Sequence, residues 1–409
     1  MESPLGARIR EARERTGMQS QELAARIGID PSAMSNIESG KRAVKTRELV
    51  LIAEALSVSP LALLDENSLP ARMHLAARLD GKQSTIEGAA YSRLRALGEI
   101  HAVLADAGLP SANTLRDVPQ FQHEWSWKAE AEQLADWATK HLGVEPTGVK
   151  RFSQFANAIE DRLGVDVIVE RYTSDPLSGA AITARDFPLI FVNAQHPTPR
   201  ALFTLAHECG HVLLSHDGST AVDDTLAGST QTERQANAFA AAFLMPADKV
   251  DNYIDEYGRG AESLARMLYD FQVSYESLIY RLHSLRRIDT DGKKSLSAVG
   301  WQGLLRVIVG TELRERLDPE IFTQLISRLG KYPAERPPSL LAARCFTGYQ
   351  RGVISVRPLA GLFKKDPDEF YDRMYDDDEK SAEVIERVEG TLPDEQVSDE
   401  ELFAGIPVL

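Results

Sequence analysis

The chain has 409 residues and a formal net charge of −15, and 43% of its residues are hydrophobic. This length predicts two or three domains with cores of their own, and two cysteines, Cys209 and Cys345, are too few for a disulfide framework. Without an N-terminal apolar run or a stretch of 18 apolar residues, the sequence argues against a secreted or membrane-spanning protein and predicts a cytoplasmic one.

Residues 1–65 are expected to form a compact, all-helical domain. Three helices are predicted at 4–15, 21–27 and 32–38, and two more at 46–56 and 60–64. Ser20 and Asp30 stand at capping positions, and Gly28 ends the second helix before a short turn. A helix, a turn and a second helix at this spacing are typical of DNA-binding proteins.

The stretch from Gln21 to Arg42, QELAARIGIDPSAMSNIESGKR, resembles the Cro/C1-type (XRE) helix-turn-helix family. The resemblance implies that the helix at 32–38 enters the major groove of DNA. The residues of this helix expected in the core are Ala33, Met34 and Ile37. Those left to reach base edges are Ser32, Ser35 and Asn36, of which asparagine can bind adenine through two hydrogen bonds.

A basic segment follows that helix. The predicted phosphate contacts are Lys41, Arg42, Lys45 and Arg47, and no acid stands among them before Glu48. Over residues 1–65, nine basic residues balance nine acidic ones, so we expect modest DNA affinity. The alternative is a helical module used only for protein contacts.

Residues 66–125 are predicted to form a helical connector. A helix at 85–107 carries apolar residues at every third or fourth position. This stripe either packs on the rest of the chain or pairs two chains. A homodimer is the more specific hypothesis, because helix-turn-helix modules commonly bind two half-sites.

An α+β domain is expected over 126–288. Two helices at 130–142 and 152–163 precede three short strands, predicted at 165–171, 179–183 and 188–193. The strands would form a small sheet packed on a helix at 199–215. The strand nearest that helix could hold an extended peptide by pairing along its edge.

The segment His207-Glu-Cys-Gly-His211 lies within the predicted helix at 199–215, where residues four apart share one face. Two histidines so placed can bind one Zn²⁺ ion, and a catalytic zinc keeps an open position for water. Glu208 stands beside them as a carboxylate that can take a proton from that water. Cys209 points to the other side of the helix and is expected in the core.

A third zinc ligand is required, and two candidates remain open. The extended motif with a downstream Gly and a third His is excluded, because Leu214 and Asp217 stand at those positions. Glu233 is the better candidate, since it lies on a second amphipathic helix that ends at Pro246 and can face the first. His216 is the alternative.

Two stretches, Arg200–Leu214 (RALFTLAHECGHVLL) and Glu233–Ala240 (ERQANAFA) with the following Leu-Met-Pro, resemble the ImmA/IrrE family of zinc metallopeptidases. The resemblance implies that Zn²⁺ is held by His207, His211 and Glu233, and that Glu208 is the catalytic base. It also implies a protein substrate, a helix-turn-helix repressor whose cleavage derepresses stress-response or mobile-element genes.

Beyond helices at 261–271 and 275–286, the sequence predicts a linker at 289–294 and a small domain of unknown role at 295–365. Residues 366–401 include sixteen acidic and three basic residues, a net charge of −13. The tail at 366–409 is therefore expected to be solvated, although it could instead mimic nucleic acid.

The sequence thus predicts a multidomain protein: an all-α helix-turn-helix domain, an α+β zincin-like metallopeptidase domain with a small sheet and an active-site helix, and a mostly helical C-terminal region with an acidic tail. The leading hypothesis is a DNA-binding transcriptional regulator whose zinc endopeptidase cuts a helix-turn-helix repressor, in trans or within its own chain. The alternative is a non-catalytic transcription factor or antitoxin-like regulator that senses a ligand or metal. A third is a protease whose N-terminal module only docks protein substrate.

Overall fold

The computed structural model describes residues 4–15, 18–56, 63, 75–79, 89–119, 126–145, 147, 151–173, 177–183, 187–214, 231–327 and 331–372. The chain divides into two compact units, Met1–Gly348 and Tyr349–Leu409. Three expectations fall outside the described residues: most of the helix at 60–64, the position of His216, and the tail beyond residue 372. Among the helices that are described, none is long and apolar enough to cross a membrane.

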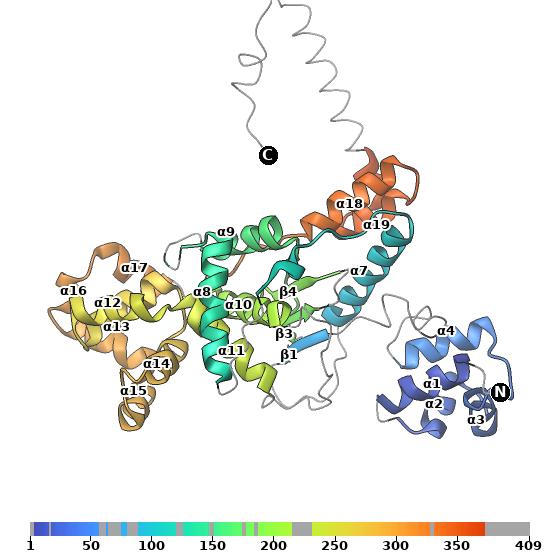
Figure 1. Cartoon of the computed structure of the whole chain (residues 1–409), viewed down its shortest axis with the longest axis horizontal. Helices are drawn as coiled ribbons and strands as arrows, with labels where there is room; N and C mark the ends of the chain where they lie inside the picture. Colours follow the sequence, from blue (N-terminus) through green and yellow to red (C-terminus); the bar gives the residue numbers. More distant parts are fainter. Residues whose placement is uncertain are drawn as a thin grey trace, which may run out of the picture. The chain divides into compact units, whose positions relative to one another are not determined.

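The N-terminal helices form a group of their own (Figure 1): α1 (Pro4–Arg15), α2 (Ser20–Ile27), α3 (Pro31–Glu38) and α4 (Thr46–Ala55). The turn between α2 and α3 has the predicted local chemistry. Gly28 ends α2 with φ 72°, a left-handed conformation that glycine adopts without strain. The carboxylate of Asp30 accepts a hydrogen bond from the backbone of Ser32 at 2.9 Å and so caps α3.

The core of this domain lies between α1, α2, α3 and α4. Met34 and Ile37 are buried as predicted, whereas Ala33 is only half-buried. A buried ion pair of Arg13 Nε with the Glu38 carboxylate (2.7 Å) ties α1 to the end of α3. Removing either partner would leave the other charge buried and uncompensated, so the pair holds α3 in a fixed orientation.

A four-stranded sheet forms the centre of the next part of the chain. Its strands are β1 (Leu75–Leu79), β2 (Asp166–Glu170), β3 (Leu177–Ile182) and β4 (Leu189–Asn193), in the order β1-β3-β4-β2. β2 and β4 are parallel, and the other two pairs are antiparallel. Every residue of β2, β3 and β4 is buried, which explains their apolar runs without alternation.

The fourth strand corrects the prediction that residues 66–125 form a helical connector. α7 (Ala89–Asp106) matches the predicted helix, but β1 precedes it and pairs with β3. The strand sequence Leu-Ala-Ala-Arg-Leu has no β-branched or aromatic residue and gives no local sign of a strand. Its extended form therefore depends on pairing with a distant segment.

Helices cover the sheet (Figure 1). They are α8 (Trp127–Leu142), α9 (Arg151–Ala158) with a π-helical end at Ile159–Leu163, α10 (Thr198–Leu214) and α11 (Gln231–Leu244), and a 3-10 turn at Leu115–Asp117 stands before them. α10 packs on β3 and β4, while α11 packs between α10 and α8. The buried guanidinium of Arg151 donates to the carbonyls of Phe271 (2.8 Å) and Phe243 (3.2 Å), which ties α9 to the ends of two other helices.

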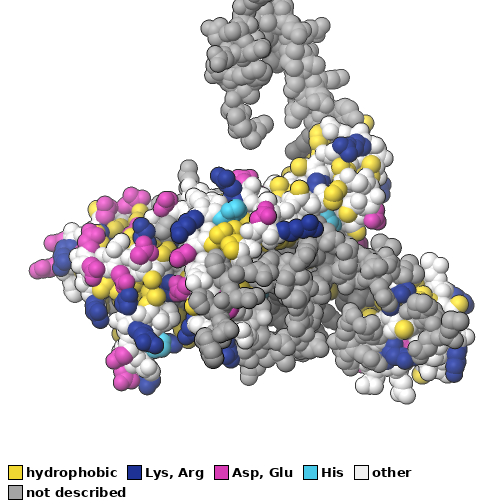
Figure 2. Space-filling model, viewed as in Figure 1, with side chains coloured by type: hydrophobic (Ala, Val, Ile, Leu, Met, Phe, Trp, Pro, Cys, Tyr) yellow, Lys and Arg dark blue, Asp and Glu magenta, His cyan; other side chains and the backbone are white. Residues whose placement is uncertain are grey.

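A helical lobe continues the same core. It comprises α12 (Ala247–Tyr257), α13 (Ala261–Phe271), α14 (Tyr275–Ser284), α15 (Thr290–Gly310), α16 (Leu313–Arg316) and α17 (Pro319–Ser327). Leu304, Ile308 and Ile321 belong to the buried cluster that contains α10 and α11, so the core runs across the boundary predicted between 288 and 295. On the face seen in Figure 2, acidic and basic side chains intermix over this lobe, as on a solvated surface.

The predicted linker at 289–294 is wrong. Its first residue, Asp289, caps α15 by accepting a hydrogen bond from Gly292 N at 2.7 Å. A cluster of Asp, Thr and Gly is common to linkers and to helix starts, so composition alone did not separate the two. α18 (Ser339–Gln350) and α19 (Val356–Leu362) follow.

Candidate functional site

α10 carries both motif histidines and is buried almost throughout. Thr198 is its first residue, and the Thr198 hydroxyl donates to the carbonyl of Lys331 at 3.1 Å. The apolar side of α10 is buried as predicted. The opposite side is covered too, with His207 1% exposed, Glu208 0% and His211 3%. The two histidines and Glu208 are therefore buried by the neighbouring elements, whereas the Glu233 side chain keeps 27% of its surface exposed.

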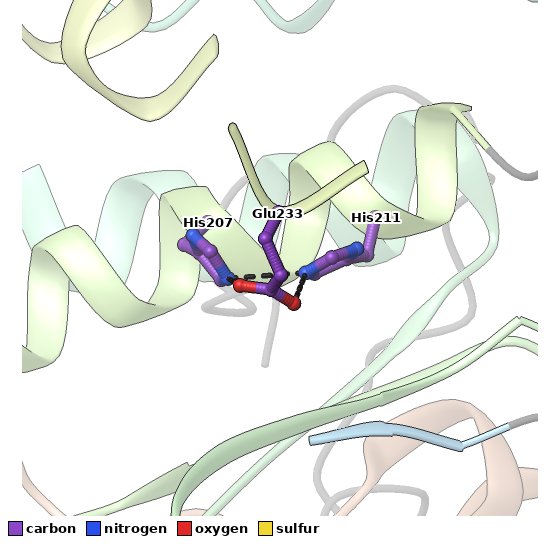
Figure 3. A group of neighbouring side chains, drawn as sticks. All are labelled: His207, His211 and Glu233. Atoms are coloured by element: carbon purple, nitrogen blue, oxygen red, sulfur yellow. Dashed lines mark hydrogen bonds and ion pairs between the residues drawn. The ribbon is translucent and has the colours of Figure 1, made fainter. Parts of the chain in front are cut away.

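The structure brings His207, His211 and Glu233 together (Figure 3). The Nε2 atoms of the two histidines are 3.0 Å apart. Glu233 reaches them from the first turn of α11, with one carboxylate oxygen 3.3 Å from His207 Nε2 and the other 3.0 Å from His211 Nε2. The two rings stand nearly perpendicular, at 78°. Both Nε2 atoms face the Glu233 carboxylate (Figure 3).

These separations suit a tetrahedral zinc ion. Zinc binds imidazole nitrogen and carboxylate oxygen at about 2.0–2.2 Å, so two ligand atoms on one tetrahedral ion lie roughly 3.3–3.5 Å apart. The histidine nitrogens are 3.0 Å apart, and each lies 3.0 or 3.3 Å from a different oxygen of Glu233. With one donor atom from each residue, the three atoms lie within 4.8 Å of one another, which is compatible with a shared ion. Two histidines and one carboxylate are also a donor set that catalytic zinc sites use.

Glu233 is held as a carboxylate. Burial alone would raise the pKa of its side chain, but hydrogen bonds from His207 and His211 outweigh burial and lower it well below its ordinary range. The group is therefore ionised throughout the physiological range, as a metal ligand must be.

A glycine of the motif permits the approach of α11. A Cβ atom at Gly210 would lie 2.9 Å from Cδ1 of Phe239 and 3.3 Å from the Cα of Ala236. A side chain at this position would push α11 away and carry Glu233 with it. Sequence reasoning passed over Gly210, although a glycine inside a helix often marks close packing.

A second glycine lies against Glu208. A Cβ atom at Gly179 on β3 would be 2.9 Å from Glu208 Oε1 and 2.2 Å from Thr204 Cγ2. The fully buried carboxylate of Glu208 therefore rests on strand backbone. Gly179 was predicted only as the start of a strand, and its role in placing Glu208 was missed. A glycine within a strand is the available signal of such an approach.

Two other residues near the motif, of types that can bind a metal, take no part in this group. Cys209 is fully buried on the far side of α10, and burial raises the pKa of its thiol to about 12, so it packs as a small apolar residue. His196 is half-buried and is not among the potential metal ligands found within the described ranges.

Some of the predicted DNA-reading side chains are exposed, and one is already hydrogen-bonded within the protein. Ser35 and Asn36 are exposed on α3, but the hydroxyl of Ser32 donates to the Asp30 carboxylate at 2.7 Å as part of the cap. Lys41 and Lys45 are exposed, which suits contact with phosphates.

Arg42 differs from its basic neighbours. Its guanidinium lies 2.7 Å from the Glu48 carboxylate, which also accepts the backbone N–H of Lys45. The hydrogen bond from Arg42 lowers the pKa of Glu48, so the acid remains ionised. Glu48 was counted only as the end of the basic segment, and its pairing with Arg42 weakens the expectation that Arg42 contacts phosphate.

Comparison with known proteins finds two segments of the chain that match known families. Residues 9–63 match the helix-turn-helix family, and residues 160–283 match a peptidase family described as the IrrE N-terminal-like domain. Two curated relatives, from Deinococcus deserti and Deinococcus radiodurans, are each named radiation response metalloprotease IrrE. They are 35% and 32% identical to this chain over 99 residues, which is 23% of the chain. The match spans 35% and 30% of the relatives' own length, about a third.

Among solved structures, Bacillus thuringiensis PlcR in complex with the peptide PapR7 and DNA matches 86% of this chain and 99% of that one, at 12% identity. Its TM-score of 0.15 is too low to indicate a shared overall fold. His207, Glu208, His211 and Glu233 all fall within the segment matched by the peptidase family. Residues 9–63 of this chain therefore form a helix-turn-helix domain, and residues 160–283 belong to the IrrE N-terminal-like peptidase family.

Proposed function

We propose that this chain is a DNA-binding regulator that carries a working zinc endopeptidase. The observation that supports the peptidase is the convergence of His207, His211 and Glu233 at separations suited to one zinc ion, with Glu208 beside them on the same helix. A site that only bound metal would have no need of this second acid. The metalloprotease names of the curated relatives agree with this assignment.

The roles of the residues follow from their positions. Zinc bound by His207, His211 and Glu233 would polarise the substrate carbonyl and make a nucleophilic water available at neutral pH. Glu208 would take the proton of the attacking water and return it to the leaving amine as the peptide bond breaks. Gly179 leaves room for the Glu208 side chain, which is fully buried beside the two buried histidines.

The substrate we propose is a repressor of the helix-turn-helix class, cut in trans or within this chain. The support is the presence of a DNA-reading domain and a peptidase domain in one polypeptide. A protease tethered to DNA would meet repressors bound nearby at a high local concentration. The exposed Ser35, Asn36, Lys41 and Lys45 are the proposed DNA contacts.

The test compares the zinc-loaded protein with its Glu208→Gln variant. Both should bind one zinc per chain, because Glu208 is not a ligand. Only the wild type should cut helix-turn-helix repressors, with new fragments read by intact mass. Helix-turn-helix proteins that accumulate uncut on the Glu208→Gln variant in cells, and vanish with wild type, would identify the substrate. If both forms hold zinc and neither cuts a repressor, a non-catalytic metal sensor replaces the enzyme.

A further inference from the structure

The strand next to Glu208 has an edge suited to an extended peptide. β3 carries Gly179, whose missing side chain lets the Glu208 carboxylate lie against the strand backbone. One edge of β3 pairs with β4. The other edge would present its N–H and C=O groups to any strand that came alongside, and such a strand would run past Glu208.

That edge is filled by the chain's own β1. β1 runs antiparallel to β3, with Leu75 opposite Ile182 and Arg78 opposite Gly179. Arg78 is thus paired with the strand residue that abuts Glu208. Across the sheet, the outer edge of β2 is occupied as well, because Arg336 exchanges backbone hydrogen bonds of 3.0 and 2.9 Å with Val169.

We infer that β1 is an inhibitory strand, a segment of this chain seated where the substrate peptide of the proposed peptidase binds. The inference rests on the proposed function, since a peptide site matters only if the peptidase acts. Substrate then has to displace residues 75–79 from the edge of β3 before its own peptide bond can reach Glu208. The resting protein is restrained by its own connector between the two domains.

The composition of β1 suits a strand that can be displaced. Its sequence, Leu-Ala-Ala-Arg-Leu, lacks the β-branched and aromatic residues that stabilise strands, and two of its five residues are alanines. The register also shifts between Arg78 and Leu79, beside Gly179, so the ladder is irregular closest to Glu208. Weak pairing of this kind can persist because the strand is tethered, which gives it an effective concentration in the millimolar range.

The first test opens the site. The test uses the full-length Glu208→Gln protein loaded with zinc and adds Ala76→Pro and Ala77→Pro. Each proline removes one backbone N–H donor. Because the N–H groups of adjacent strand residues point to opposite edges, one of the two lost donors is directed toward β3. The probe is a fluorescent synthetic peptide with the sequence of residues 70–84. We expect the proline variant to bind this probe at least about tenfold more tightly than the Glu208→Gln parent, because the tethered competitor is gone. A scrambled peptide is the control for sequence.

The second test closes the site and does not depend on tolerance of proline. Ala77 and Ala180 are register partners, so a cysteine at each can form a cross-strand disulfide with β1 in place. The native Cys209 and Cys345 are buried, and burial raises the pKa of each thiol to about 12, so they should not compete. Oxidation of the Ala77→Cys/Ala180→Cys protein should abolish probe binding, and reduction should restore it. The single variant Ala77→Cys should not respond.

The outcomes separate this inference from the proposed function. Probe affinity that is equal in the proline variant and its parent, together with a locked protein that still binds, would overturn the inhibitory strand. Tighter binding by the proline variant and none by the locked one would support it even if zinc-loaded wild type cut no protein. In that case the peptide site would stand and the endopeptidase proposal would fail.

Discussion

Gly179 on β3 and Glu208 on α10 are packed so closely that a methyl group on the glycine would lie 2.9 Å from the Glu208 carboxylate oxygen. The contact joins the sheet to the candidate catalytic residue at a point that tolerates no side chain. It also places the edge of β3, and with it β1, at the candidate site. The position of Glu208 is thus decided by a residue on another element.

Replacing Gly179 by alanine should separate catalysis from zinc binding. The new methyl group would press on Thr204 and Glu208, which supply its three nearest atoms, and none of these atoms belongs to a proposed ligand. We expect peptidase kcat to fall by at least about tenfold, a loss of about 1.4 kcal/mol of transition-state stabilisation, with one zinc still bound per chain. Turnover of a cut repressor and metal analysis on the same sample measure both quantities.

The matched control is Gly260→Ala, because nothing lies within 4 Å of a Cβ built at Gly260. This variant should keep wild-type turnover. An unchanged kcat in the Gly179→Ala protein would show that Glu208 is not positioned by β3.

What the sequence predicted well is what short stretches determine. The turn at Gly28 and Asp30 follows from glycine conformation and side-chain capping, both properties of a few neighbouring residues. The shared face of His207 and His211 follows from helix geometry alone. Glu233 was reached through the pattern of a second helix, and the structure brings it to both histidines, although only the fold could set the separation.

What the sequence did not predict depends on distant partners. β1 has no strand composition of its own and is defined by pairing with β3, about a hundred residues later in the chain. Asp289 has the composition of a linker around it, and its role as a cap depends on Gly292, in a helix whose start has no distinctive sequence. Arg42 was counted as a free cation because its pairing with Glu48 requires the turn into α4 to be known.

Zinc should stabilise the peptidase domain through the bridge between α10 and α11. Because the two helices contribute separate ligands, unfolding of either one destroys the site and releases the ion. At a free zinc concentration of 100 times Kd, mass action predicts a gain of about 2.7 kcal/mol in the free energy of unfolding. A thermal melt with zinc and with a chelator measures the difference.

The variant His211→Ala should lose most of this zinc-dependent gain, whereas His141→Ala, an exposed histidine outside the site, should keep it. A melting temperature that rises equally with zinc in all three proteins would place the metal elsewhere in the chain.

Asp166 should make stability fall as pH rises. Burial is the main cause that raises the pKa of this carboxyl from 3.8 to about 7, although the backbone N–H groups of Leu341 and Leu340 favour its charged form. Between these two pKa values the folded chain holds a proton that the unfolded chain has released. The free energy of unfolding therefore decreases with pH across this window, by on the order of 4 kcal/mol in total.

The variant Asp166→Asn keeps an oxygen acceptor but cannot ionise. Its stability relative to wild type should increase steadily from pH 5 to pH 7, as measured by chemical denaturation of both proteins at each pH. Asp291→Asn removes an exposed carboxyl, 88% accessible, and serves as the control with no such trend. A constant difference between wild type and Asp166→Asn over this range would mean that Asp166 is charged in the folded state.

The salt dependence of DNA binding should distinguish Lys41 from Arg42, although they are neighbours. Each phosphate contact contributes about 0.9 to the slope of log K against log salt concentration for duplex DNA. The exposed Lys41 is free to contribute a full contact, whereas the guanidinium of Arg42 is already neutralised by Glu48 at 2.7 Å. Lys41→Ala should reduce the slope by about 0.9, and Arg42→Ala should leave it nearly unchanged.

Fluorescence anisotropy with a mixed-sequence duplex between 50 and 200 mM KCl provides the slopes, with the exposed Lys249→Ala as a charge-matched control. Equal losses for Lys41→Ala and Arg42→Ala would mean that DNA draws Arg42 away from Glu48.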